Sequence, residues 1–274
     1  MKKRNQFNLA ITFGLLILFI LYTIALMYID VKPIGPRGSS VGFAAINEPV
    51  KHLFGVDMVL YNITDWLGLI AILVALGFAV LGLVQLIKRK SLLRVDSSIL
   101  VLGGFYLLVM AAYLFFEYNV VNYRPVLIND VLEASYPSST TMLVMCVMIT
   151  AMMQFNRLIQ NQKARTVVNI LSGVFTVSMI VGRILSGVHW FTDIVGGILL
   201  SSTLIMLYYS VNVYIELENK RFLEALATLE SKLVDGQIVV ERVVPKLAGL
   251  SFCKKGRPSE LATKRYHEIL RNLG

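Results

Sequence analysis

Six long apolar stretches alternate with polar and basic segments along this chain of 274 residues. A helix needs about 20 mostly apolar residues to cross the hydrocarbon core of a bilayer. The stretches that meet this requirement are Leu9–Tyr28, Leu67–Ile87, Ile99–Phe116, Ser139–Phe155, Val167–Leu185 and His189–Tyr209. The pattern therefore predicts an all-α, polytopic membrane bundle of six transmembrane helices.

The composition agrees with a membrane location, and this location changes how the positive net charge is interpreted. Hydrophobic residues make up 56% of the chain and charged residues only 16%, against roughly a quarter charged in soluble domains. A net charge of +9 would suggest nucleic acid as a partner of a soluble protein. In a membrane protein, basic residues orient the helices and meet anionic lipid head groups. We expect membrane lipids as partners and no nucleic acid.

Lysine and arginine are concentrated in alternate connections, which predicts the orientation in the membrane. With six spans, one side carries Lys2, Lys3, Arg4, Lys88, Arg89, Lys90, Arg94, Arg157, Lys163, Arg165, Lys220 and Arg221. This side is expected to be cytoplasmic, so both termini are cytoplasmic. The segment at Arg124 and the turn from Arg183 to His189 then face outward together.

The domain organisation follows from a change of composition near Tyr214. Residues 1–214 are predicted to form the six-span membrane domain. Residues 215–274 are predicted to form a basic cytoplasmic tail with amphipathic helices, over Glu216–Leu233 and Ser259–Leu273. A further amphipathic piece, Glu48–Leu60, is expected in the long outer loop.

Three ionisable residues interrupt the apolar pattern between the fifth and sixth stretches: Arg183, His189 and Asp193. Ionisable side chains are costly at membrane depth and usually mark function. If the sixth helix begins near His189, then His189 and Asp193 share one helix face. A carboxylate can fix the tautomer of an imidazole, and an arginine offers a fork of donors suited to phosphate. This set predicts phosphoryl transfer through a histidine nucleophile.

Two more segments complete a family resemblance. They are Asn122-Tyr123-Arg124-Pro125 and Tyr136-Pro137-Ser138-Ser139-Thr140-Thr141. Together with Arg183, His189 and Asp193, their order and spacing resemble the type-2 phosphatidic acid phosphatase superfamily of integral membrane lipid phosphatases, over roughly residues 99–209. The resemblance implies that His189 is the nucleophile and that Asp193 orients it. It also implies that Arg124, Arg183 and Ser138 bind the phosphate. Ser139 and Thr140 are expected to offer further donors.

Two positions depart from the family pattern and suggest a substrate preference. Glu117 stands where the family has a lysine, and Thr140 stands where the family has the histidine that protonates the leaving group. General acid catalysis contributes about 10²–10⁴-fold, and its loss matters least when the leaving group is itself a phosphate. If the protein is active, we expect it to favour a lipid diphosphate over a lipid monophosphate. Undecaprenyl diphosphate is the candidate from the family's range, which implies a bacterial plasma membrane.

Several alternatives stay open at this point. A non-catalytic relative would keep the fold and bind phospholipid head groups, and a transporter would use Arg183 and His189 as a pathway, although inverted repeats are not evident. No metal or cofactor is expected, because the arginines supply the positive charge. Lys51 and His52 of the outer loop either fold over the site or form a solvated pair. Glycines at 182, 187, 196 and 197 are interpreted as points of close helix contact.

Overall fold

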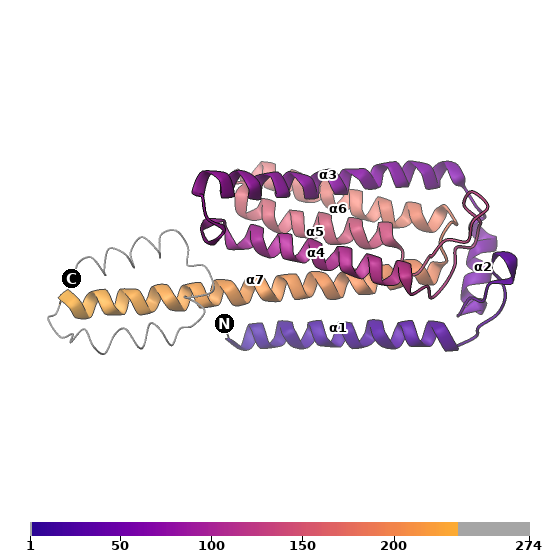
Figure 1. Ribbon diagram of the computed structural model, residues 1–274, viewed down its shortest axis with the longest axis horizontal. Coiled ribbons are helices and arrows are strands. Elements are labelled where there is room, and N and C mark those ends of the chain that lie inside the picture. Colours follow the sequence, from indigo (N-terminus) through magenta and orange to yellow (C-terminus); the bar gives the residue numbers. More distant parts are fainter. Residues whose placement is uncertain (1, 235–274) are drawn as a thin grey trace.

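The computed structural model describes residues 2–234, and over that range the chain forms seven α-helices (Figure 1). They are α1 (Lys2–Tyr28), α2 (Ala44–Phe54), α3 (Met58–Arg89), α4 (Ser97–Tyr118), α5 (Ser139–Leu158), α6 (Gln162–Leu185) and α7 (Phe191–Val234). All except α2 are long and apolar enough to cross a membrane. The predicted all-α bundle of six spans is confirmed, and the protein is an integral membrane protein.

Helices α5 and α7 form the centre of the bundle. Over half of the residues in their most apolar stretches are buried (56% in each), against 17% in α1 and in α3. Helix α1 packs along α7, while α3 and α6 pack against α5 (Figure 1). The exposed apolar faces of α1 and α3 are suited to contact with lipid, because helices satisfy their own backbone hydrogen bonds there.

Helix α3 begins earlier than its apolar stretch predicted, at Met58 rather than Leu67. Asp57 caps the helix, since its Oδ1 accepts a hydrogen bond of 2.9 Å from the backbone N–H of Leu60. The first two turns carry polar residues that line the end of the bundle, and these interrupt the apolar pattern. The amphipathic piece predicted over Glu48–Leu60 is displaced toward the N-terminus: α2 ends at Phe54, before Gly55 with a φ of +67°.

Helix α7 differs from its prediction at both ends. It begins at Phe191, so His189 lies in the preceding turn and not on the helix. It then continues without a break to Val234, so the amphipathic stretch Glu216–Leu233 prolongs the sixth span as one helix. The predicted boundary between residues 214 and 215 falls inside this helix. The second predicted tail helix, Ser259–Leu273, lies outside the described residues.

The direction of the helices gathers three connections at one end of the bundle: residues 29–57, 119–138 and 186–190. Helix α2 lies across this end (Figure 1). The opposite end carries the start of α1 and the connections 90–96 and 159–161, together with most of the basic residues in the described range. All three motif segments therefore meet at the same end of the protein.

Close helix contact is confirmed at Gly182 and Gly197, whereas Gly196 approaches Tyr136 of the connection between α4 and α5. A Cβ atom at Gly182 would lie 2.6 Å from the Thr64 side chain, and one at Gly197 would lie 3.1 Å from the carbonyl oxygen of Ser138. A Cβ atom at Gly196 would overlap the ring of Tyr136. Gly187 is different, because it forms the turn before α7 with a φ of +62° and faces the backbone of Gly55.

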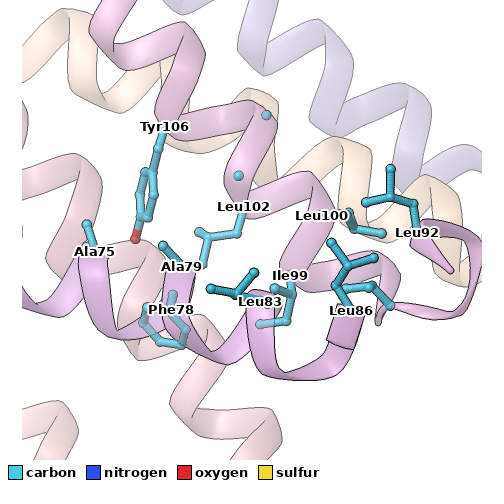
Figure 2. Close-up of a pocket in the computed structure, with 14 residues that line it drawn as sticks. Ala75, Phe78, Ala79, Leu83, Leu86, Leu92, Ile99, Leu100, Leu102 and Tyr106 are labelled. Atoms are coloured by element: carbon cyan, nitrogen blue, oxygen red, sulfur yellow. The ribbon is translucent and has the colours of Figure 1, made fainter. Parts of the chain in front are cut away.

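A cavity of about 420 Å³ lies between α3 and α4, in the half of the bundle away from the three motif segments. Apolar side chains line it, and Tyr106 reaches from α4 toward Ala75 of α3 (Figure 2). Its lining carries no charged side chain. This cavity therefore lacks the charged donors that bind a phosphate group strongly.

Candidate active site

The connection between α4 and α5 folds back on itself and brings separate motif residues together. The backbone N–H of Arg124 donates to the carbonyl oxygen of Glu133 at 3.0 Å, and the N–H of Ser135 donates to the carbonyl oxygen of Asn122 at 2.9 Å. This antiparallel pairing sets the side chains of Asn122, Arg124 and Ser135 beside one another at the end of the bundle.

His189 lies in the turn between α6 and α7, where its neighbour Trp190 ties the turn to that connection. The indole Nε1 of Trp190 donates to the carbonyl oxygen of Tyr123 at 2.8 Å. The expectation that His189 and Asp193 share a helix face is wrong, because α7 begins after the histidine. The two side chains are joined instead through Ser135, a residue that the motif pattern did not single out.

A chain of hydrogen bonds defines the tautomer of His189. Arg124 Nη1 lies 3.1 Å from His189 Nε2, and a guanidinium only donates, so Nε2 accepts. The Ser135 hydroxyl donates to Asp193 Oδ2 at 2.5 Å. Because the single hydroxyl proton of Ser135 is directed at Asp193, the Ser135 oxygen accepts a hydrogen bond from His189 Nδ1, at 3.0 Å. The imidazole is therefore protonated on Nδ1, and the lone pair of Nε2 faces Arg124.

The surroundings of His189 keep its ring neutral. Burial lowers the pKa of His189 well below its usual range, and the positive charges of Arg124 and Arg183 lower it further. The residue is 5% exposed. Since the ring is uncharged near neutral pH, Nε2 keeps a lone pair, which accepts the hydrogen bond from Arg124.

The carboxylate of Asp193 is fully buried and held from several sides. Besides the Ser135 hydroxyl, Asn122 Nδ2 donates to Oδ1 at 3.2 Å and the backbone N–H of Trp190 donates to Oδ2 at 3.1 Å. These donors fix the orientation of the carboxylate. It is thus placed, through Ser135, to stabilise positive charge that develops on His189.

Arg183, at the end of α6, presents unused donors to the site. Its Nη2 donates to Thr140 Oγ1 at 2.5 Å and pairs with Asp65 Oδ1 at 2.7 Å. Its Nε and Nη1 are buried without a hydrogen-bond partner in the described part of the chain. The ring of Tyr61 lies beneath both arginines, 4.8 Å from the Arg183 guanidinium carbon and 5.7 Å from that of Arg124. Buried, unpaired guanidinium donors are suited to bind an oxyanion.

The second motif lies at the N-terminus of α5. The backbone N–H of Ser138 donates to the carbonyl oxygen of Asp193 at 2.9 Å, which fixes this segment against α7. The Ser138 hydroxyl is buried and has no hydrogen-bond partner within residues 2–234. Ser139 and Thr140 begin the helix, and the free N–H groups of a first helical turn attract anions. The structure therefore brings Ser138, Ser139 and Thr140 to the same place as the two arginines.

A polar cavity of about 280 Å³ adjoins these groups. Arg124, Ser135 and Ser139 line it, together with Glu117 and Glu133. Arg124 Nε forms an ion pair of 3.1 Å with Glu133 Oε2. Glu117, at the position where the family pattern has a lysine, therefore adds a carboxylate to the same cavity.

Sequence reasoning missed three residues of this site, Tyr61, Asp65 and Ser135, and assigned no role to Asn122. Asn122 is part of the first motif segment and Ser135 directly precedes the second, so proximity in sequence was the available signal. Tyr61 and Asp65 lie in the first turns of α3, where no motif marked them. Of the outer-loop pair, His52 is exposed and Lys51 contacts Pro125. Within the described residues, no cluster of three His, Cys, Asp or Glu side chains is suited to a metal ion.

The fold and the site together define a helical membrane protein with a buried, arginine-flanked histidine at one end of the bundle. Residues 103–216 match the sequence profile of the PAP2 superfamily. Over these residues the chain is similar to the PAP2 superfamily, which confirms the resemblance inferred from the motifs.

The fold is similar to that in the crystal structure of a transmembrane PAP2-type phosphatidylglycerolphosphate phosphatase from Bacillus subtilis. The two chains are 20% identical with a TM-score of 0.50, and the match covers 74% of this chain and 96% of that chain. No curated protein sequence matches the chain. At the level of the family, these findings support a membrane lipid phosphatase, and therefore a phosphoric ester hydrolase.

Proposed function

We propose that this protein hydrolyses lipid phosphates or diphosphates through a phosphohistidine intermediate on His189. The observation that carries the proposal is the hydrogen-bonded chain from Arg124 through His189 and Ser135 to Asp193. It leaves the Nε2 lone pair of a neutral imidazole directed at an arginine. Such an arrangement is suited to nucleophilic attack on a bound phosphate.

The phosphate group is bound by donors that converge on the space beside His189. Arg183 Nε and Nη1, the Ser138 hydroxyl and the first turn of α5 have unused hydrogen-bonding capacity. Arg124 moves from His189 Nε2 to a phosphate oxygen, which frees the lone pair. Because Arg183 and the Ser138 segment are held in place before the substrate arrives, they stabilise the charge of the transition state at little cost in reorganisation.

The reaction then proceeds in two displacements. His189 Nε2 forms a bond to phosphorus as the bond from phosphorus to the leaving oxygen breaks, and the leaving group takes a proton from solvent. Asp193 stabilises the imidazolium through Ser135. Water then forms a bond to phosphorus as the bond to Nε2 breaks, releasing orthophosphate and a proton and restoring the neutral imidazole.

The expected preference for a diphosphate substrate rests on Thr140. Its hydroxyl oxygen accepts a hydrogen bond from Arg183, and a threonine cannot act as an acid near neutral pH. A phosphate leaving group needs little protonation, whereas an alkoxide needs a great deal. The B. subtilis neighbour is a phosphatidylglycerolphosphate phosphatase, so that monophosphate is the natural comparison.

The test of function and preference is phosphate release by the purified protein in detergent micelles. We expect a higher kcat/KM for farnesyl diphosphate than for phosphatidate or phosphatidylglycerolphosphate, and loss of release in His189→Ala. A clear preference for either monophosphate would contradict the diphosphate assignment. Release that persists in His189→Ala would contradict the mechanism.

The second candidate function is head-group binding without turnover. The observation in its favour is the replacement of two positions of the family pattern, by Glu117 for the lysine and by Thr140 for the histidine that protonates the leaving group. Arg183 still offers buried donors that have no partner in the described residues, so a phosphate group could be bound without being released. Orthophosphate binding by the wild type, lost in Arg183→Ala and accompanied by no phosphate release, would support this function over the enzyme.

We propose that the site faces the extracytoplasmic side, because most basic residues of the described range lie at the opposite end of the bundle. Both chain termini are then cytoplasmic. In intact cells, a membrane-impermeant maleimide should label Ser40→Cys, an exposed position of the connection between α1 and α2, and spare the exposed Lys90→Cys. Labelling of Lys90→Cys alone would reverse the orientation.

A further inference from the structure

Helix α2 and the turn after it, which are not part of the six spans, lie alongside the turn that carries His189. Their contacts run in opposite directions along the two segments. Asn47 contacts Thr192, Lys51 contacts Trp190, and Asp57 bonds to Ser186 through its backbone N–H at 3.0 Å. The segment from α2 to Asp57 therefore supports the turn that carries His189 along its whole length.

Asn47 anchors the first half of this support. It is 1% exposed, and its side-chain Nδ2 donates to Thr192 Oγ1 at 2.8 Å and to the carbonyl oxygen of Gly42 at 2.8 Å. Its Oδ1 accepts from the backbone N–H and from the hydroxyl of Thr192, at 3.2 Å each. Every donor and acceptor of this buried amide is used, so α2 is fixed to the start of α7.

Lys51, one helical turn further on, contacts both the connection between α4 and α5 and the turn between α6 and α7. Its Nζ donates to the carbonyl oxygen of Pro125 at 3.0 Å, and the ammonium lies 5.1 Å from the centre of the Trp190 ring. Pro125 directly follows Arg124, and Trp190 directly follows His189. The Lys51 ammonium group thus contacts the residue that follows Arg124 and the residue that follows His189. The side chains of Arg124 and His189 themselves meet at 3.1 Å.

The environment of Lys51 agrees with a fixed position rather than a solvated one. Burial lowers the pKa of Lys51, and only Glu48 opposes this effect. A lysine that lies over an indole and donates to a carbonyl oxygen is held by both contacts. His52, the next residue, is exposed on the same helix, so the contact with the site belongs to one face of α2.

We propose that Lys51 is a positioning residue that holds the Arg124 segment and the His189 turn in register, so that arginine and imidazole meet correctly. This inference rests on the proposed function for its activity readout. Lys51 does not touch the reacting atoms: it acts through Pro125 and Trp190. Misplacement of catalytic groups by about 1 Å can cost on the order of 100-fold in rate, so its loss should appear mainly in kcat.

The kinetic test compares three variants under identical micelle conditions. Lys51→Met keeps much of the aliphatic chain and removes the ammonium, so kcat should fall by roughly 10- to 100-fold with a much smaller change in KM. Lys51→Arg can still donate and lie over the indole, so it should recover most of the activity. His52→Ala is the matched control and should behave as the wild type. An unchanged kcat in Lys51→Met, or a Lys51→Arg variant as slow as Lys51→Met, would overturn the proposal.

Hydrogen–deuterium exchange gives a readout that does not depend on turnover. Peptides that cover residues 122–126 and 186–192 should exchange faster in Lys51→Met than in the wild type, while peptides from α5 should not change. His52→Ala should leave all of them unchanged. Equal exchange in Lys51→Met and wild type would overturn the inference even if the protein is an active phosphatase. A wild type without phosphatase activity would instead contradict the proposed function.

Discussion

Arg124 and His189 meet directly, with Nη1 of the arginine 3.1 Å from Nε2 of the imidazole, although 65 positions separate them in the chain. The contact fixes which nitrogen of the ring holds the lone pair. It also puts a permanent positive charge next to a group that must be neutral to act as a nucleophile.

The first prediction concerns the pH dependence of activity. Burial, then Arg124 and then Arg183, lower the pKa of His189. Removing the guanidinium in Arg124→Gln takes away one of these effects, so the pKa of His189 should rise toward 6.5. The neutral fraction is then lost at a higher pH, and the acid limb of kcat/KM should move to higher pH. The control is Arg37→Gln, which removes an exposed arginine of the same end of the bundle. A limb that stays in place, or moves to lower pH, would contradict the assignment.

Ser135 is the second target. Its hydroxyl connects His189 Nδ1 with Asp193 Oδ2, and the loss of a buried hydrogen bond to a charged group costs about 1.5–3 kcal/mol. Ser135→Ala should therefore lower kcat by roughly 10- to 100-fold, and Ser135→Thr should restore part of it. The matched control is Ser202→Ala, whose hydroxyl bonds only to the backbone of its own helix. Wild-type kinetics in Ser135→Ala would show that Asp193 acts on His189 without it.

The third prediction concerns Asp65, whose exposed carboxylate pairs with the buried Arg183. This negative charge lies beside the donors proposed to bind phosphate. At a solvated site, like charges about 4 Å apart repel by roughly 1 kcal/mol. Asp65→Asn keeps an oxygen for Arg183 and removes the charge, so the inhibition constant of orthophosphate should fall about two- to tenfold. The effect should weaken at high salt. A higher inhibition constant would mean that the charge of Asp65 is needed to orient Arg183.

The fourth prediction concerns the turn at Gly187. A left-handed backbone costs an L-residue about 1–2 kcal/mol, and a Cβ atom at this position would overlap the carbonyl group of Gly55. Gly187→Ala should therefore lower the thermal midpoint in detergent and abolish most activity. Gly173→Ala is the control, because a Cβ atom there meets nothing within 4 Å and alanine favours a helix. Equal midpoints for the two variants would contradict the described turn.

Much of the fold could be predicted from the sequence, because hydrocarbon imposes a minimum length on each apolar helix. The six spans were found for that reason, and the start of α5 was predicted at Ser139 as observed. The first residue of a helix was harder to predict where the first turns of that helix line the site. The first turns of α3 face the site and carry polar residues, so the apolar pattern began only at Leu67.

The site was predicted in its motif residues and not in their connections. Arg183, His189 and Asp193 were identified because they interrupt the apolar pattern, and the family resemblance added Arg124 and Ser138. The structure brings these residues to the same end of the bundle. The hydrogen bonds that join His189 to Asp193 could not be predicted. They pass through Ser135, which lies in the folded connection between α4 and α5, where helical periodicity gives no information. The same holds for Lys51, whose contacts depend on where α2 lies across the end of the bundle.

The most direct test of the central claim is to trap the covalent intermediate. The purified protein would be mixed with farnesyl diphosphate labelled with ³²P in its terminal phosphate and quenched in alkaline detergent within milliseconds. We predict label that resists base, is lost in acid, lies on the peptide containing His189, and is absent from His189→Ala. Turnover without any labelled protein, or equal labelling of His189→Ala, would contradict the account.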